Sequence, residues 1–571
     1  MPWKQTYDPL GHPALSTAAA AVPVVLLLAL LGGFHWAAHR AALAGLAAAA
    51  AVAAFVYGMP ADALAAAAVY GAAFGLLPIG WTLVSALFLY NLTVASGQFE
   101  IVKESVASLS ADRRVQVVLI AFCFGAFLEG AAGFGFPVAI CAALLMGLGF
   151  PPLQAAGLAL IANTSPVAFG SLGTPIVTLA AVTADAGTDP AALANLYGKM
   201  AGRQLPFFSV LVPVWLVAVM GGLRALRGVW PAMLTAGGSF ALVQHLTAEH
   251  LGPGLVDVTA GLAALLSMAV LLRFWQPAFD AEFAGTPSPS GGEGAAAARP
   301  PRSAAAVLYA WTPWLIMTAL ILVWAAPPVK KRFDALSAPA FEVPGLHRVI
   351  ARGPEVRGPD VPVGQAVEDA RYKLNWISAT GTGMLLAAVL SSAWLGIGPG
   401  RFVRVFAQTL HQLRLSLATI VCMLALGFVT KYSGQDVTLG LAFTHTGAAY
   451  PFFSAMLGWL GVALTGSDTS SNVLFGNLQK ITAHNLSDAG VIPLDRAQAT
   501  TLLCTANSTG GVMGKMVDAQ SIVVASAATG WHGHEGRILR FVFWHSLILA
   551  ALVGLLVTVQ AYWWTSAVPT E

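Results

Sequence analysis

Charged side chains are scarce in this chain. Asp, Glu, Lys and Arg make up 10% of its 571 residues, whereas a soluble globular protein has about 25%. Hydrophobic residues reach 57%, and apolar runs recur from end to end. Since a helix of about 20 apolar residues crosses a bilayer, the composition predicts an all-α polytopic membrane protein with about 12–14 transmembrane segments. The clearest runs are 14–33, 41–57, 63–90, 205–222, 304–326, 376–396 and 541–561.

Cysteines and the short motifs of enzymes are the next absences. The four cysteines, Cys123, Cys141, Cys422 and Cys504, are far apart in apolar sequence and show no CxxC spacing. This pattern excludes a disulfide framework and argues against a zinc site. HExxH, GxSxG and the Walker A phosphate loop are also missing. We therefore expect neither an enzyme nor an ATP-driven pump, and no cofactor, metal or nucleic-acid partner.

The positions of the few basic residues predict the topology. Arg40 follows the first apolar run, only Asp62 lies between the second and third, and Lys103, Arg113 and Arg114 follow the third. Because cytoplasmic loops are enriched in Lys and Arg, the loops after the first and third runs are expected inside and the N-terminus outside. The first run has no basic segment before it and no small-residue cleavage site, so we expect a retained span.

Low-complexity sequence divides the chain into two halves. Residues 277–303 are rich in Gly, Pro, Ser and Ala, a composition typical of a flexible connector. It separates an N-terminal transmembrane half, 1–276, from a C-terminal half, 304–571. Within the second half, 330–373 holds both charge signs and several prolines, and we expect an extramembrane loop there.

A short pattern occurs in both halves. An acidic residue near glycine is followed by an Asn-hydroxyl-hydroxyl triplet that ends an apolar run, and a glycine comes seven residues after the asparagine. The matching positions are Glu129-Gly130, Asn163–Ser165 and Gly170, and then Gly466, Asp468, Asn507–Thr509 and Gly514. Inverted repeats are common in transporters, so we expect two of them here, with chance as the alternative for so short a match.

The sequence after Glu129 is built to interrupt helices inside the membrane. It contains no charge before Asp185 and is broken repeatedly by glycine and proline, which weaken or end helices. Irregular backbone at membrane depth is tolerated only where protein or a water-filled cavity surrounds it. We therefore expect discontinuous helices or re-entrant hairpins here and again at 465–476 and 507–514. Helix N-termini that meet there would favour an anion.

Two acids in apolar surroundings, Glu129 and Asp468, are candidates for proton coupling. An ionisable group inside a span costs several kcal/mol unless it is paired or protonated, so it is a functional candidate by default. Burial favours the neutral carboxyl, which suits a group that loads and releases a proton. The alternative is that either acid pairs with Arg203 or Lys515 only to hold helices together.

The candidates for holding an anion are Lys515, Arg203 and neutral donors near the helix breaks. Lys515 lies in a glycine-rich stretch with Asp518 three residues on, which could tune it. Arg203 could equally be an interfacial anchor at a helix start. The neutral candidates are Asn163, Thr164, Ser165, Ser470, Ser471, Asn472, Asn507, Ser508, Thr509, Gly510 and Gly511.

Four long strings identify a family resemblance. They are FCFGAFLEGAAGFGFP (122–137), NTSPVAFGSLGTPI (163–176), LTGSDTSSNVLF (464–475) and ANSTGGVMGKMVDAQSI (506–522). With WKQTYDP at 3–9, they make the chain resemble the bacterial lactate permeases, the lactate/glycolate:proton symporters. The resemblance implies a multi-pass protein of the bacterial inner membrane that takes up L-lactate, D-lactate and glycolate with protons. It also implies alternating access with two inverted repeats and paired hairpins.

The residues leave two other functions open. Unwound carbonyls near the Asn triplets could bind sodium, which would give a sodium-coupled carrier of a related organic acid. A channel for small solutes is the other alternative, and accumulation against a gradient would exclude it. The oligomeric state is not predicted.

Overall fold

The computed structural model describes residues 2–30, 34, 36–131, 133, 135–184, 189–278, 280, 282–283, 303–353, 367–444 and 446–570. The all-α prediction is confirmed, since the strands in this part of the chain are only two or three residues long. The helices before the connector are α1 (Pro13–Leu28), α2 (Ala38–Phe55), α3 (Ala61–Phe74), α4 (Trp81–Ala95), α5 (Gln98–Leu109), α6 (Arg113–Val117), α7 (Gly125–Ala131), α8 (Phe136–Gly147), α9 (Pro152–Ala162), α10 (Gly170–Thr183), α11 (Pro190–Gly221), α12 (Trp230–His250) and α13 (Val256–Phe274). After it come α14 (Ala304–Ala325), α15 (Pro327–Ser337), α17 (Thr380–Trp394), α18 (Pro399–Ser433), α19 (Gln435–Thr444), α20 (Tyr450–Thr465), α21 (Asp468–Asp488), α22 (Arg496–Gly514), α23 (Ala519–Ala528) and α24 (Glu535–Tyr562).

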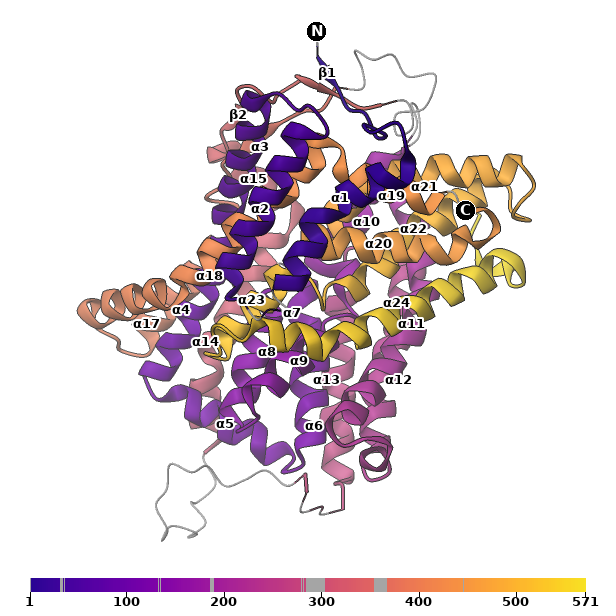
Figure 1. Ribbon diagram of the computed structural model, residues 1–571. Coiled ribbons are helices and arrows are strands. Elements are labelled where there is room, and N and C mark those ends of the chain that lie inside the picture. Colours follow the sequence, from indigo (N-terminus) through magenta and orange to yellow (C-terminus); the bar gives the residue numbers. More distant parts are fainter. Residues whose placement is uncertain are drawn as a thin grey trace.

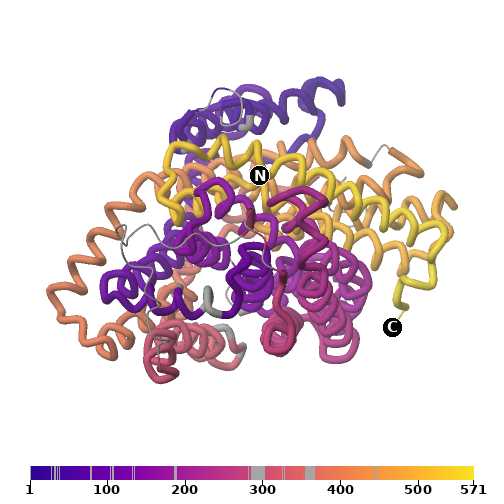
Figure 2. Tube along the Cα trace, turned by 90° about the horizontal axis from the view of Figure 1, so that it is seen from below, coloured from indigo at the N-terminus to yellow at the C-terminus, as the bar shows by residue number. Residues whose placement is uncertain are grey.

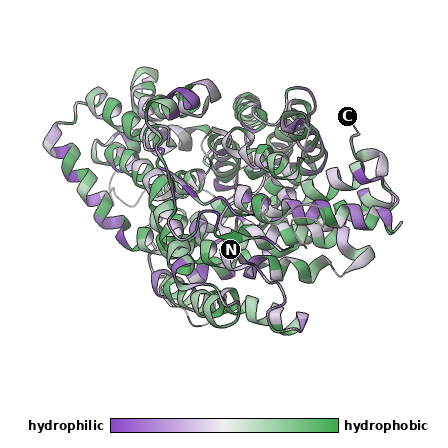
Figure 3. Ribbon diagram, turned by 90° about the horizontal axis from the view of Figure 1, so that it is seen from above, coloured by the Kyte–Doolittle hydropathy of each residue, from purple (hydrophilic) through white to green (hydrophobic). Residues whose placement is uncertain are grey.

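The helices match a membrane protein in length and polarity. In the described residues, seven helices are long and apolar enough to cross a bilayer, or eight if α9 and α10, bent by 62°, count as one span. This is fewer than the 12–14 segments expected, because several apolar runs form helices of 10–17 residues. Hydrophobic residues cover most of the helices (Figure 3), and large apolar side chains such as Phe55, Leu223 and Phe274 are exposed. Lipid is the solvent that suits such a surface.

The same order of helices and breaks occurs in both halves. In the first, α7 and α8 are separated by a break, then α9 and α10 by another, and the long α11 follows. In the second, α20 and α21 are separated by a break, then α22 and α23, and the long α24 follows. The repeat expected from the short sequence pattern therefore extends over five helices in each half.

The two repeats pack against each other through reciprocal contacts between equivalent helices. Helix α10 contacts α21 and α22 of the second repeat, and its counterpart α23 contacts α8 and α9 of the first. Likewise α11 contacts α22, while α24 contacts α9. Figure 1 shows the orange and yellow helices beside α10 and α11, and Figure 2 shows the C-terminal helices crossing those of the first repeat. Such reciprocal contacts are those of a two-fold arrangement.

The breaks are made by backbone conformations that a helix cannot contain. Gly466 between α20 and α21 is left-handed, with φ of 71°, and so is Gly135 before α8, with φ of 78°. At the start of α10, Ser171 and Leu172 have φ of 49° and 56°, which is unfavourable for residues with a side chain. Conformations of this kind cost about 1–3 kcal/mol each and are concentrated at functional sites.

The N-terminal segment is tied to the polar segment at 330–373. Strand β1 (Trp3–Lys4) pairs in parallel with β3 (Ile350–Ala351), and β2 (Ala340–Glu342) pairs antiparallel with β4 (Arg371–Lys373). The Gln5 amide donates to the carbonyls of Lys431 and Tyr432 at the end of α18. These strands lie at the top of Figure 1. The predicted connector, 277–303, falls mostly outside the described residues, and so do residues 354–366 of the polar segment.

Gly458 provides a test of the packing between the two helices α20 and α22. A Cβ atom placed on Gly458 would lie 1.9 Å from the carbonyl oxygen of Asn507. We expect Gly458→Ala to destabilise the protein by about 1–3 kcal/mol or more, because a well-packed core cannot accept the extra methyl group. Gly238 in α12 has open space around it, so Gly238→Ala should stabilise by up to about 1 kcal/mol. Thermal unfolding of both variants in detergent measures the difference, and equal melting temperatures would contradict this packing.

Candidate functional site

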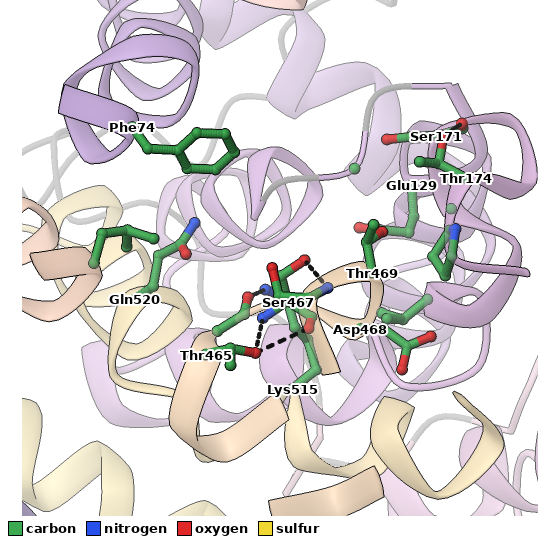
Figure 4. A pocket seen from close by; sticks show the side chains of 17 residues that line it. Phe74, Glu129, Ser171, Thr174, Thr465, Ser467, Asp468, Thr469, Lys515 and Gln520 are labelled. Carbon is green, nitrogen blue, oxygen red and sulfur yellow. Dashed lines mark hydrogen bonds between the residues drawn. The ribbon is translucent and has the colours of Figure 1, made fainter. Parts of the chain in front are cut away.

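A cavity of about 160 Å³ lies between the two repeats. Its walls come from the break before α10, from the break between α20 and α21, and from Glu129 and Lys515. Phe74 of α3 and Leu424 of α18 close it with apolar surface. In Figure 4, Glu129, Ser171 and Thr174 lie on one side of the cavity and Phe74 and Gln520 on the other. The lining residues are Phe74, Glu129, Gly133, Val167, Gly170, Ser171, Thr174, Pro175, Leu424, Thr465, Gly466, Ser467, Asp468, Thr469, Ser470, Lys515 and Gln520.

Two helix N-termini meet at this cavity, as the glycines and prolines of the sequence predicted. Ser467 is the N-cap of α21, and its hydroxyl accepts the backbone N–H of Ser470. Helix α10 becomes regular only after Gly173, so its first helical residues are Thr174 and Pro175. Helix N-termini offer free N–H groups and partial positive charge to an anion. A carboxylate would find two such ends in the cavity.

Lys515 is the only cationic side chain among those that line this cavity in the described part of the chain. Its Nζ donates to the carbonyl oxygen of Gly466 at 2.6 Å and lies 3.4 Å from a carboxylate oxygen of Asp518. Asp518 in turn caps α23, because it accepts the backbone N–H of Ser521. The ammonium group is thus held at the break between α22 and α23, beside the N-terminus of α21.

Glu129 reaches the cavity from the end of α7. Its side chain is buried, and its Oε2 atom has no hydrogen-bond partner among the described residues. A Cβ atom placed on Gly170 would lie 2.7 Å from Oε1, so only glycine leaves room for this carboxyl. Lys515 is close enough for its charge to act on Glu129. Glu129 is therefore an acid at the cavity wall that has capacity to bind a proton.

Asp468 begins α21 and is held more firmly. Its Oδ2 atom accepts a hydrogen bond from the hydroxyl of Ser508, and a Cβ atom on Gly511 would lie 2.3 Å from Oδ1. Figure 4 shows the carboxyl pointing away from Ser467 and Lys515. The two predicted acids thus lie at the same cavity but in different environments.

The two Asn triplets do not line the cavity. Asn507 donates to Asn472 at 2.9 Å and accepts from Gln479 at 3.1 Å, and Thr509 donates to Gln204 at 2.7 Å. Asn163 and Ser165 are buried at the break between α9 and α10, and they too lie outside the cavity lining. Thr164 donates to a backbone carbonyl of its own helix. The second triplet therefore connects helices behind the cavity wall, and Asn163 of the first lies beside Glu129.

Most of the other neutral candidates also lie behind this wall. Ser471 donates to the carbonyl of Gly458, and Asn472 donates to the carbonyl of Pro175. Gly510 packs against the backbone of Ala455 in the neighbouring helix. Ser470 is the one neutral candidate of the predicted set that lines the cavity in the described residues. A break needs polar residues to satisfy its backbone as well as to bind a ligand, and the sequence pattern does not separate these roles.

Arg203 lies elsewhere in the molecule. It forms an ion pair with Glu249, with 2.9 Å between the atoms, and donates to the carbonyl of Ala567. Together with Phe207 and Trp564 it lines a separate hollow. The structure does not bring Arg203 to the central cavity. It also places Arg203 inside α11, not at a helix start as the alternative expected.

Several residues of the cavity were not predicted. Ser171 and Thr174 follow the predicted break, so their position was signalled by the glycines and proline around them. Phe74 and Leu424 lie inside apolar helices, and nothing in their local sequence distinguishes them from lipid-facing residues. Only the packing of α3 and α18 against the repeats places them at the site.

Comparisons with known proteins identify relatives of this chain. The family model described as L-lactate permease matches residues 16–564. The glycolate permease GlcA of Escherichia coli K12 is 45% identical, over 99% of each chain. The L-lactate permease of the same strain is 44% identical over 99% of this chain and all of its own, and that of Bacillus subtilis is 42% identical over the whole of both. Among solved structures, the YdaH transporter of Alcanivorax borkumensis aligns over 86% of each chain with 14% identity and a TM-score of 0.28.

The family match and these relatives cover nearly the whole chain, at more than 40% identity to several permeases. The chain is a multi-pass transporter and not an enzyme, and it belongs to the L-lactate permease family.

Proposed function

We propose that this protein takes up L-lactate, and also D-lactate and glycolate, by proton symport through alternating access in the bacterial inner membrane. The observation that supports it most is the central cavity, where one ammonium group and two helix N-termini face the same small space. A cavity of about 160 Å³ is small and suits an acid with only a few non-hydrogen atoms. The relatives named as lactate and glycolate permeases are consistent with that size.

The substrate carboxylate is expected to lie between Lys515 and the N-terminus of α21. Charge-assisted hydrogen bonds to a carboxylate are about twice as strong as neutral ones, so this contact would supply most of the affinity. The substrate hydroxyl would then be close to Ser470, whose side chain lines the cavity. Phe74 and Leu424 would cover the methyl group of lactate, which glycolate lacks.

Proton coupling is assigned to Glu129 or Asp468, and the geometry favours Glu129. Each acid has one carboxyl oxygen without a partner among the described residues. The other oxygen of Asp468 accepts the hydroxyl of Ser508, and its carboxyl points away from Lys515. A proton on Glu129 would lower the negative charge of the site when the anionic substrate enters. The N-terminus is proposed to be periplasmic, from the distribution of basic residues.

Uptake of radiolabelled L-lactate into proteoliposomes tests the proposal. A gradient of about one pH unit is worth about 1.4 kcal/mol and supports about tenfold accumulation for one proton per substrate. We expect that accumulation without sodium, its loss with a protonophore, and competition by D-lactate and glycolate. Accumulation that requires sodium would contradict proton coupling, and equilibration without accumulation would indicate a channel.

A further inference from the structure

A third acid, Asp257, lies behind Glu129. It is in the first turn of α13 and is 1% exposed. Neither of its carboxyl oxygens has a hydrogen-bond partner among the described residues. Asp257 does not belong to the cavity lining, and the sequence motifs around the two repeats do not include it. A buried carboxyl without hydrogen bonds is unstable as an anion, so its presence requires an explanation.

The packing of α13 on α7 brings Asp257 close to Glu129. A Cβ atom placed on Gly130 would lie 2.7 Å from the Cβ of Asp257, and one placed on Gly261 would lie 2.7 Å from the backbone of Phe127. Glycines on both helices thus allow the two backbones to approach. Asp257 therefore packs against the residue that follows Glu129 in the chain.

The charge balance around the pair is negative. The titratable groups that face Glu129 in the described chain are Asp257 from α13, Lys515 from the α22–α23 break and the thiol of Cys141 from α8. The neutral side chain of Asn163 also faces it. Lys515 is already 3.4 Å from Asp518, so its charge is shared. Two adjacent buried carboxylates cannot both be ionised. The two acids are therefore expected to hold at least one proton between them.

We propose that Glu129 and Asp257 form a carboxyl pair that holds the transported proton, with Glu129 exchanging it with the cavity. This inference rests on the proposed proton symport. Proton loading would make the pair neutral before the substrate anion binds beside Lys515. Release of the proton to the other side would restore a negative charge next to the site and help expel the anion.

Asp257→Asn tests the pair through the pH profile of uptake. Because the pair holds at least one proton, Glu129 ionises beside a protonated Asp257 that can share the remaining proton and the charge. Asparagine cannot share them, so Glu129 becomes harder to ionise and half-maximal uptake should move to more alkaline pH. Exchange of labelled for unlabelled lactate at equal pH on both sides should remain, because Asp257 does not line the cavity. Asp257→Glu should restore the profile in part. Asp436→Asn is the control, since Asp436 is equally buried, has an oxygen without a partner in the described residues, and lies in α19.

An unchanged pH profile in folded Asp257→Asn would overturn the proposal. If that variant does not fold, dicyclohexylcarbodiimide labelling of the unmodified protein provides the test, because this apolar reagent modifies protonated carboxyls inside membranes. We expect labelling of Glu129 or Asp257 near neutral pH, and labelling of neither residue would overturn the pair. Absence of proton-driven uptake by the unmodified protein would refute the proposed function instead, and the labelling would still report on the shared proton.

Discussion

Replacement of Lys515 by methionine is expected to abolish lactate uptake. The variant removes the ammonium group that lines the cavity and leaves the substrate carboxylate without its cation. Truncation of one partner of a buried, hydrogen-bonded charge pair costs about 2–5 kcal/mol, which weakens binding at least about 30-fold. Equilibrium binding of lactate to the detergent-solubilised protein measures this loss, and exchange in proteoliposomes measures its consequence for transport.

Lys480→Met is the matched control for this variant. Lys480 is also mostly buried and also donates to a backbone carbonyl, that of Thr183, but it does not line the central cavity. Its replacement should leave lactate affinity close to that of the unmodified protein. Lys515→Met also removes the partner of Asp518, so the thermal stability of Lys515→Met and Lys515→Met/Asp518→Asn should be compared. Normal lactate affinity in folded Lys515→Met would contradict the proposed carboxylate site.

Replacement of Glu129 by glutamine is expected to separate transport from the proton gradient. Glutamine fits the space beside Gly170 but cannot bind and release a proton. Under a gradient of about one pH unit, accumulation should therefore fall from about tenfold to none. Exchange of labelled lactate across the membrane should continue, because Lys515 and the helix N-termini remain. Proteoliposome uptake with and without the gradient measures both quantities.

Asp468→Asn provides the comparison within the same cavity. Asparagine keeps an oxygen that can accept the hydroxyl of Ser508, so we expect this variant to retain most of its proton-driven accumulation. The reverse outcome, with coupling lost in Asp468→Asn and kept in Glu129→Gln, would assign the proton to Asp468. Loss of exchange as well as accumulation in Glu129→Gln would show instead that Glu129 is needed for substrate binding.

The candidate site could be located from the sequence, but its lining could not. Glycine and proline change the local backbone directly, so the breaks near residues 133, 170, 466 and 515 were predictable. Lys515 and both acids next to those breaks were found in the same way. Asn507 has the same kind of sequence environment as Lys515, yet it bonds to Asn472 and Gln479 behind the wall.

Composition alone determined that this is a polytopic helical membrane protein, and the long glycine-rich strings determined its resemblance to the lactate permeases. Both are properties of contiguous residues, because a span and a helix break each depend on about 20 residues or fewer. The tertiary structure decided which polar side chains face the cavity. In it, Arg203 forms an ion pair with Glu249, and Asp257 of another helix packs against Gly130, next to Glu129. Phe74 and Leu424 meet at the cavity although they are hundreds of residues apart in sequence. Such contacts depend on how distant helices pack, and no local pattern records that packing.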